Sequence, residues 1–134
     1  MKARMWLLGC VALLLAVTSP LQAHHSFAAQ FDVNNVQTLV GTITKMEWRS
    51  PHAWLYIDVK KDSGEVESWS LEFSSANTLY SRGWRKEDLP IGATVTVTGY
   101  GARDPKLHTL SARQVKLPDG KTLFEGAAAA AQGQ

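Results

Sequence analysis

The sequence predicts a small all-β domain, a barrel of five or six strands with one short helix. Three observations predict it: apolar and polar residues alternate in several short segments, turn residues separate these segments, and one segment between the third and fourth strands carries helix-capping residues. Once the terminal segments are set aside, the remaining length suits one domain with a single core.

The clearest prediction is a β-hairpin over residues 40–59. Its second half alternates strictly, with Ala53, Leu55, Ile57 and Val59 on one face and Trp54, Tyr56, Asp58 and Lys60 on the other. In the first half the apolar parity changes between Ile43 and Met46, which indicates a β-bulge near Thr44–Lys45. Proline cannot donate to a strand ladder, so the corner of the hairpin is expected at or before Pro51.

A third strand and a short helix are expected next. Trp69, Leu71 and Phe73 alternate with polar residues, so this strand should bury an aromatic face. Residues 74–83 begin with serines that suit an N-cap and end at a glycine, which predicts a helix of about two turns. We expect Trp69, Phe73 and Ile43 in the core.

Two further strands and an edge strand complete the prediction. After a turn at residues 88–92, strands are expected at residues 94–98 and 107–117, the latter with a second bulge, and a short edge strand at residues 121–124. Three strands, a helix and two strands, with a long bulged first strand, is the order of an OB-fold barrel. A small sandwich is the alternative, but a helix between strands three and four favours the OB-fold-like barrel, which it would close at one end.

The N-terminus reads as a secretory signal peptide. A basic start at Lys2 and Arg4 precedes about 13 apolar residues, a run too short for a membrane span. Cleavage is expected after Ala23, and a second small-residue site after Ala28 is the alternative. In chain order we expect a signal peptide at residues 1–23, an N-terminal arm at 24–36, a barrel domain at 37–125 and a disordered tail at 126–134.

Export changes the charge balance of the chain. Removing Lys2 and Arg4 leaves 12 of the 14 basic residues against 12 acidic ones, so the net charge falls from +2 to zero. No basic excess remains to attract nucleic acid or anionic lipid. Cys10, the single cysteine, would leave with the signal peptide. We therefore expect a periplasmic or secreted protein without disulfides and without a membrane anchor.

Several short motifs together resemble a family of small exported bacterial proteins of unknown function. They are His24-His25-Ser26-Phe27, Gly41-Thr42-Ile43, Glu47-Trp48, Pro51-His52, Gly83-Trp84 and Leu117-Pro118-Asp119-Gly120. This resemblance implies a periplasmic all-β domain and brings no activity with it. His24, His25 and His52 fall within its motifs, whereas the role of His108 rests on this sequence alone.

The four histidines are the candidate metal ligands. In an OB-fold the loops that carry His52 and His108 border the same ligand face, and an arm that folds back would add His24 and His25. Cleavage after Ala23 would free the α-amine of His24, and amine and imidazole nitrogens suit copper or nickel well and zinc adequately. The arrangement resembles histidine-brace copper sites. Copper is the expected metal, and a solvated N-terminus with a structural His52 is the plain alternative.

Trp54 and Tyr56 support a second hypothesis, a recognition or accessory domain that binds no metal. Both lie on the outward parity of the second strand, where OB-folds stack bases or sugars. Export and zero net charge disfavour nucleic acid, which leaves a protein, a peptide or a sugar as the partner. The carboxylates of this region, at Glu47, Asp58, Glu67 and Glu72, show no spacing typical of acid–base catalysis and suit a solvated strand surface, so an enzyme is not expected.

Overall fold

The computed structural model describes residues 27–125. The predicted signal peptide, His24, His25 and the predicted tail lie outside the described residues. The chain divides into two units, residues 1–30 and residues 31–134. In the first unit, residues 27–30 form one helical turn. The second unit contains every described strand.

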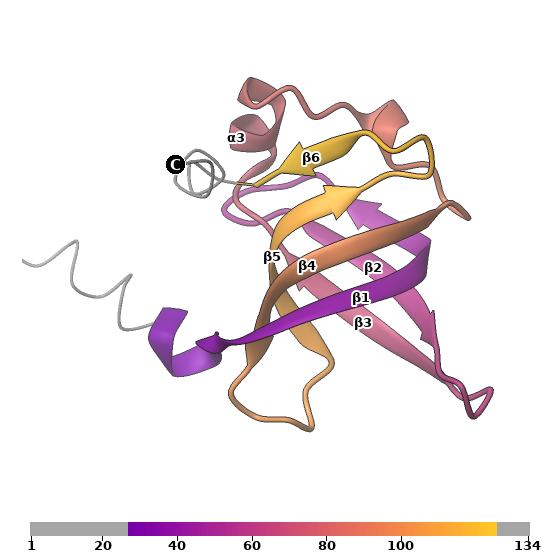
Figure 1. The fold of residues 1–134 in the computed structure, drawn as a ribbon. Helices are drawn as coiled ribbons and strands as arrows, with labels where there is room; N and C mark the ends of the chain where they lie inside the picture. The colour runs from indigo at the N-terminus through magenta and orange to yellow at the C-terminus, as the bar shows by residue number, and fades with distance from the viewer. Residues whose placement is uncertain (1–26, 126–134) are drawn as a thin grey trace, which may run out of the picture. The chain divides into compact units, whose positions relative to one another are not determined.

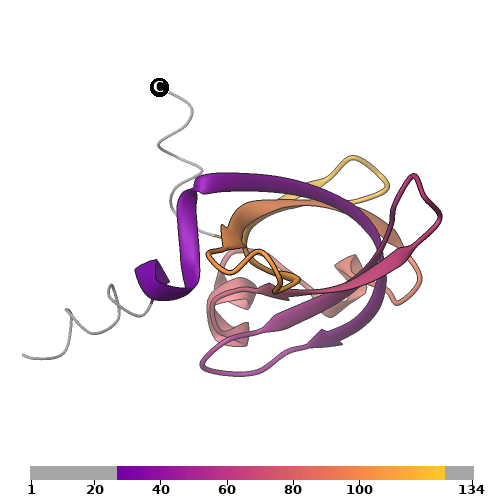
Figure 2. The ribbon, with the colours of Figure 1, turned by 90° about the horizontal axis from the view of Figure 1, so that it is seen from below.

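A single sheet that curls into a ring forms the second unit (Figures 1 and 2). Its strands are β1 (Phe31–Glu47), β2 (Trp54–Lys60), β3 (Val66–Glu72), β4 (Thr94–Ala102), β5 (Thr109–Lys116) and β6 (Thr122–Phe124). They follow the order β3-β2-β1-β4-β5-β6 with antiparallel neighbours, and a parallel pairing of β3 with β5 closes the ring. The predicted all-β, barrel-like fold class is confirmed.

β1 is long because it pairs with two neighbouring strands in turn. Phe31–Thr42 pairs with β4, and Thr42–Glu47 pairs with β2. The register with β2 shifts between Ile43 and Lys45, so the predicted bulge is present. Gly41 stands where the strands approach closely, since a Cβ atom there would lie 2.8 Å from the carbonyl oxygen of Asp58.

The first residues of β1 differ from the sequence expectation. Residues 31–36, expected in the N-terminal arm, belong to the strand. Phe31 pairs with Ala102 of β4 and is only 4% exposed. The Asn-rich stretch obscured this pairing, because the register between β1 and β4 shifts between Phe31 and Val36 and breaks the alternation on which the sequence prediction relied.

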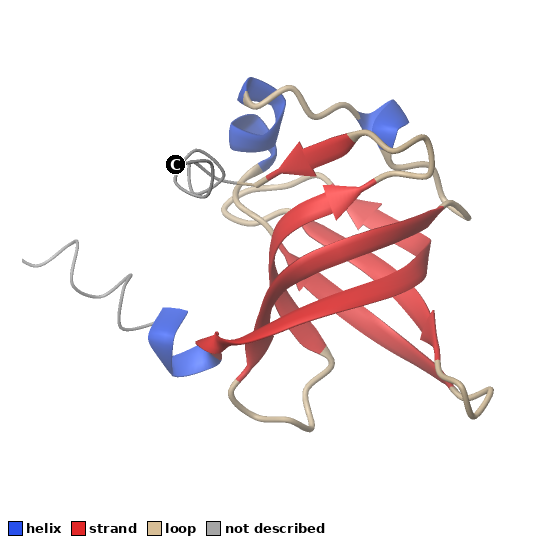
Figure 3. Ribbon diagram, in the orientation of Figure 1, coloured by secondary structure: helices blue, strands red, loops and turns tan. Residues whose placement is uncertain are grey.

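The predicted helix is α3 (Ala76–Ser81), followed by a 3-10 turn, η1 (Lys86–Asp88) (Figure 3). Ser75 is the N-cap, and its hydroxyl accepts a hydrogen bond from the backbone N–H of Thr78. Gly83 follows the helix with φ of +91°, a conformation that favours glycine. Among the described residues, none of the helices has the length and apolar character that crossing a bilayer requires.

The core confirms two of the three expected residues and corrects the third. Ile43 and Phe73 are almost fully buried, but Trp69 is only half-buried. Trp84 is the large aromatic residue at the centre: it is 0% exposed, packs edge-on against Phe73, and donates its indole N–H to the carbonyl oxygen of Phe124 at 3.1 Å. Trp69 has the inward parity of β3, yet it lies toward one end of the curled sheet. Its aromatic neighbour there is a loop residue, His108.

The second predicted bulge is also present. The register between β4 and β5 shifts at Gly99, where Ala112 and Gln114 pair with successive residues of β4 and Arg113 is the extra residue. A Cβ atom on Gly99 would lie 2.3 Å from the carbonyl oxygen of Ser111, so only glycine fits this backbone contact.

Candidate functional site

The outer surface of the sheet over β2 and β3, here named the β2–β3 outer face, carries the predicted recognition residues. Cross-strand pairing arranges it in three rows: Glu47, Trp54 and Glu72; Lys45, Tyr56 and Ser70; and Thr42, Asp58 and Ser68. Leu55 and Ile57 have the opposite parity and are 0% exposed. Trp54 and Tyr56 are therefore directed outward, as the alternation predicts, and both are half-buried.

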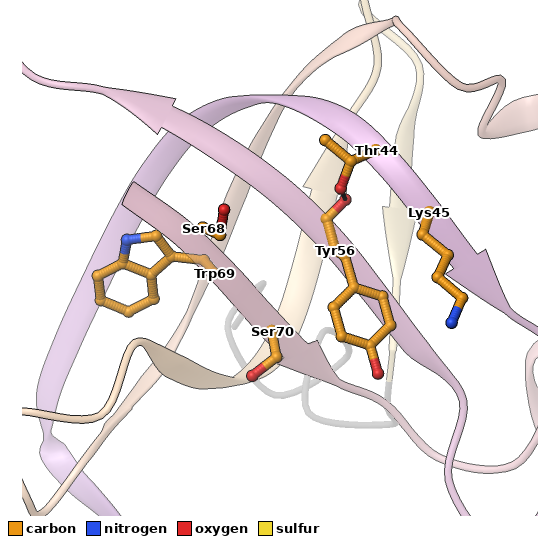
Figure 4. Close-up of a pocket in the computed structure, with 6 residues that line it drawn as sticks. All are labelled: Thr44, Lys45, Tyr56, Ser68, Trp69 and Ser70. Atoms are coloured by element: carbon orange, nitrogen blue, oxygen red, sulfur yellow. Dashed lines mark hydrogen bonds between the residues drawn. The ribbon is translucent and has the colours of Figure 1, made fainter. Parts of the chain in front are cut away.

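An open depression of about 400 Å³ lies at the centre of this face (Figure 4). Its lining consists of Thr44, Lys45, Tyr56, Ser68, Trp69 and Ser70. The Trp69 ring is directed away from the Tyr56 ring (Figure 4). Tyr56 therefore supplies the aromatic surface at the centre of the depression. The extra residue of the β1 bulge, Thr44, reaches this lining because the bulge changes the parity of β1 at that position.

A network of charged groups borders the depression on the β1 side. Glu47 accepts hydrogen bonds from Lys45 and from the Tyr56 hydroxyl, the latter at 3.3 Å, and Arg49 lies 3.1 Å from the same carboxylate. The hydrogen bond from Lys45 lowers the pKa of Glu47, and Arg49 adds to this effect. Glu47 is thus an ionised acceptor that holds the Tyr56 ring in position.

His52 lies beyond one end of this face with one ring nitrogen engaged. Its Nδ1 is 3.0 Å from the carbonyl oxygen of Phe73 and 3.0 Å from Oε1 of Glu72. A carbonyl oxygen only accepts, so Nδ1 carries the proton and the Nε2 lone pair of neutral His52 is left for another partner. Burial raises the pKa of Glu72, an effect that His52 opposes and the carboxylate of Glu125 reinforces.

His108 occupies a different environment. Its ring stacks on Trp69 with centroids 5.1 Å apart, and its Nε2 is 3.4 Å from Oε1 of Glu67. The same carboxylate accepts from the indole N–H of Trp69 and pairs with Lys61. The hydrogen bond from Lys61 lowers the pKa of Glu67. His108 therefore fastens the β4–β5 loop to the start of β3.

The two described histidines are not gathered into one cluster. His52 contacts the end of β3, at Glu72 and Phe73, whereas His108 contacts its start. Within residues 27–125, no group of three or more His, Cys, Asp or Glu side chains is arranged to hold a metal ion. His24 and His25, the other two predicted ligands, lie outside the described residues.

Sequence reasoning underestimated the acidic residues of these strands. Glu47, Glu67 and Glu72 each position an aromatic or histidine side chain, whereas the spacing of these charges alone suggested only a solvated strand surface. Glu47 and Glu72 lie on either side of Trp54 across the strands, a relation that can be recognised only when the strand register is known. Glu67 and Trp69 are two residues apart on the same strand, so their spacing was the one indication that the sequence itself offered.

Comparison with known proteins adds the family. A model described as a family of unknown function, DUF6152, matches residues 12–112. The chain belongs to this family. The DUF6152 match includes all nine residues of the β2–β3 outer face together with His52 and His108, and it begins within the predicted signal peptide. No curated protein and no solved structure matches the chain.

Proposed function

We propose that this DUF6152 member is an exported OB-fold domain that recognises a ligand through its β2–β3 outer face. The ring order β1-β2-β3-β5-β4, the parallel β3–β5 pairing and the helix between β3 and β4 support the OB-fold assignment. The signal-like sequence of residues 1–23 supports export to the periplasm or the exterior.

The observation that carries the proposal is the depression around Tyr56. In OB-folds the surface of strands two and three is the usual ligand surface, and here that surface holds an aromatic ring, hydroxyl groups and an open hollow together. Glu47 holds the Tyr56 hydroxyl, so the ring is already ordered before a ligand arrives, which lowers the entropic cost of binding.

The test is a nuclear magnetic resonance titration of the isotope-labelled mature protein with four soluble probes. The probes are a neutral hexasaccharide, an oligogalacturonate, a mixed tripeptide library and spermidine. Recognition predicts that at least one probe shifts the Trp54 indole and Tyr56 resonances and that Tyr56→Ala abolishes the shift of the Trp54 indole. Shifts confined to other surfaces with every probe would refute the proposal.

Copper binding is the second candidate function, and the geometry of His52 favours it. Metal-ligating histidines usually donate their other ring N–H to a carboxylate or a backbone carbonyl, and Nδ1 of His52 has both kinds of partner. The side chain is 50% exposed, so Nε2 is accessible. His24 and His25 would supply the remaining nitrogens if cleavage follows Ala23.

Three proteins test the copper candidate: one beginning at His24, one with a single residue added before His24, and His52→Ala. We expect the first to bind one Cu(II) with nitrogen ligands and the other two to bind more weakly, because an added residue moves the α-amine off His24. Affinity should fall at acidic pH, because a protonated imidazole or amine nitrogen cannot bind the metal. Identical affinities and identical electron paramagnetic resonance spectra would exclude a shared site.

A further inference from the structure

The hydroxyl groups that line the depression donate their hydrogen bonds to acceptors within the protein. Thr44 donates to the carbonyl oxygen of Tyr56 at 3.2 Å, and Ser68 donates to Oδ1 of Asp58 at 2.7 Å. Ser70 points its hydroxyl at the carbonyl oxygen of His108 at 3.4 Å. Carbonyl and carboxylate oxygens cannot donate, so the direction of each bond is settled by its acceptor.

The Tyr56 hydroxyl follows the same rule, because it donates to the Glu47 carboxylate. Each of the four hydroxyl oxygens therefore retains lone pairs and offers a ligand an acceptor. Lys45 is the one cation of the lining, and Glu47 pairs with it. Its ammonium lies over the Tyr56 ring, 5.4 Å from the centroid, on the opposite side of Tyr56 from Ser70 (Figure 4).

These contacts exclude several ligand classes. A phosphate or carboxylate ligand would meet acceptors and the carboxylates of Glu47 and Asp58, and the nearest cation is already neutralised. An extended peptide could not add a strand beside β2, which pairs with β1 on one side and β3 on the other, or beside Ser70–Glu72 of β3, which pairs with β5. A polyamine would gain little, since the two charges of Lys45 and Arg49 balance the two of Glu47 and Asp58.

We infer that the ligand of this depression is a neutral, polyhydroxylated molecule, a carbohydrate, whose hydroxyl groups donate to Thr44, Ser68 and Ser70 while an apolar sugar face packs on the Tyr56 ring. The hydroxyl groups of a sugar can donate to these protein oxygens, whose own protons are engaged within the protein. A sugar ring offers several hydroxyl groups at the spacing of neighbouring side chains. Trp54, two residues along the same face, extends the aromatic surface to an adjacent sugar unit. This inference rests on the proposed function and specifies its ligand.

The test measures affinities for four neutral hexasaccharides (maltohexaose, cellohexaose, chitohexaose and mannohexaose) by the same titration. We expect at least one to bind at the depression. Ser70→Ala should weaken it about three- to tenfold through the loss of one acceptor, and Tyr56→Ala by at least about tenfold. Tyr56→Phe keeps the ring and should bind far better than Tyr56→Ala.

Thr38→Ala is the matched control, because this exposed β1 hydroxyl bonds to Thr98 on another part of the sheet. Its affinity should equal that of the wild type. Binding of the tripeptides or spermidine at the depression, with no response to the sugars, would overturn the carbohydrate inference and leave the proposed function standing. Sugar affinity that is unchanged in both Ser70→Ala and Tyr56→Ala would also overturn it, and no response to any probe would overturn both.

Discussion

At the scale of single residues, Trp84 and Trp69 have different roles in the packing of the domain. Trp84 is fully enclosed, with Phe73 against its ring and the Phe124 carbonyl on its indole N–H. Trp69 has the inward parity of a strand, yet it is half-buried and its ring stacks on that of His108. Alternation reports which face a residue occupies, but not how far along the strand the packed interior extends.

We predict that Trp84→Ala lowers the free energy of unfolding by about 3–5 kcal/mol, the range for truncating a large buried aromatic residue. Trp69→Ala should cost clearly less, because part of the Trp69 ring already faces solvent. Trp54→Ala, on the outer face, is the control. Urea titration of the three variants measures these losses, and a Trp69→Ala loss as large as that of Trp84→Ala would contradict this account of the core.

The acid dependence of stability provides a second residue-scale prediction, at Glu67. Lys61 lowers the pKa of Glu67 in the folded state, so the unfolded chain takes up the proton first as the pH falls. The stability that Glu67 contributes is thus complete above the unfolded pKa and is lost as the pH falls through the folded pKa. Glu67→Gln should destabilise the protein at neutral pH, and its difference from the wild type should shrink below about pH 4.

Urea midpoints measured between neutral and acidic pH test this expectation. Glu87→Gln, in the exposed η1 turn, is the control and should follow the wild-type curve. A Glu67→Gln difference that stays constant across the whole pH range would show that the ionised form of Glu67 contributes nothing to stability.

At the scale of elements, β1 decides where the folded domain begins. Its first residues pair with β4, and Phe31 is buried there. A protein beginning at Phe31 should unfold cooperatively, whereas one beginning at Gln37 should be less stable by at least about 2 kcal/mol, since it loses a buried aromatic side chain and part of the ladder. Denaturant unfolding of the two truncations provides the comparison, and equal stability would favour the boundary that the sequence pattern suggested.

Both bulges belong to this scale as well, and their positions were predicted from changes of apolar parity. A bulge adds one residue to one strand, so the buried positions change between odd and even numbers, and that change is visible in a single chain. The residues opposite a bulge cannot be identified in this way. Only the structure shows that Arg113 is the additional residue opposite Thr98 and Gly99 of β4, and that Thr44 lines the depression.

At the scale of the whole molecule, the sequence by itself determined the all-β class, the order of strands and helix along the chain, a serine N-cap for the helix and the outward direction of Trp54 and Tyr56. These features follow from local alternation, capping and turn chemistry, which act between residues close in the chain. The tertiary structure alone decided the closure of the ring by β3 and β5, the central place of Trp84 and the separate environments of His52 and His108. The physical reason is that these features depend on register between strands distant in sequence, and a one-residue change of register would give each side chain different partners.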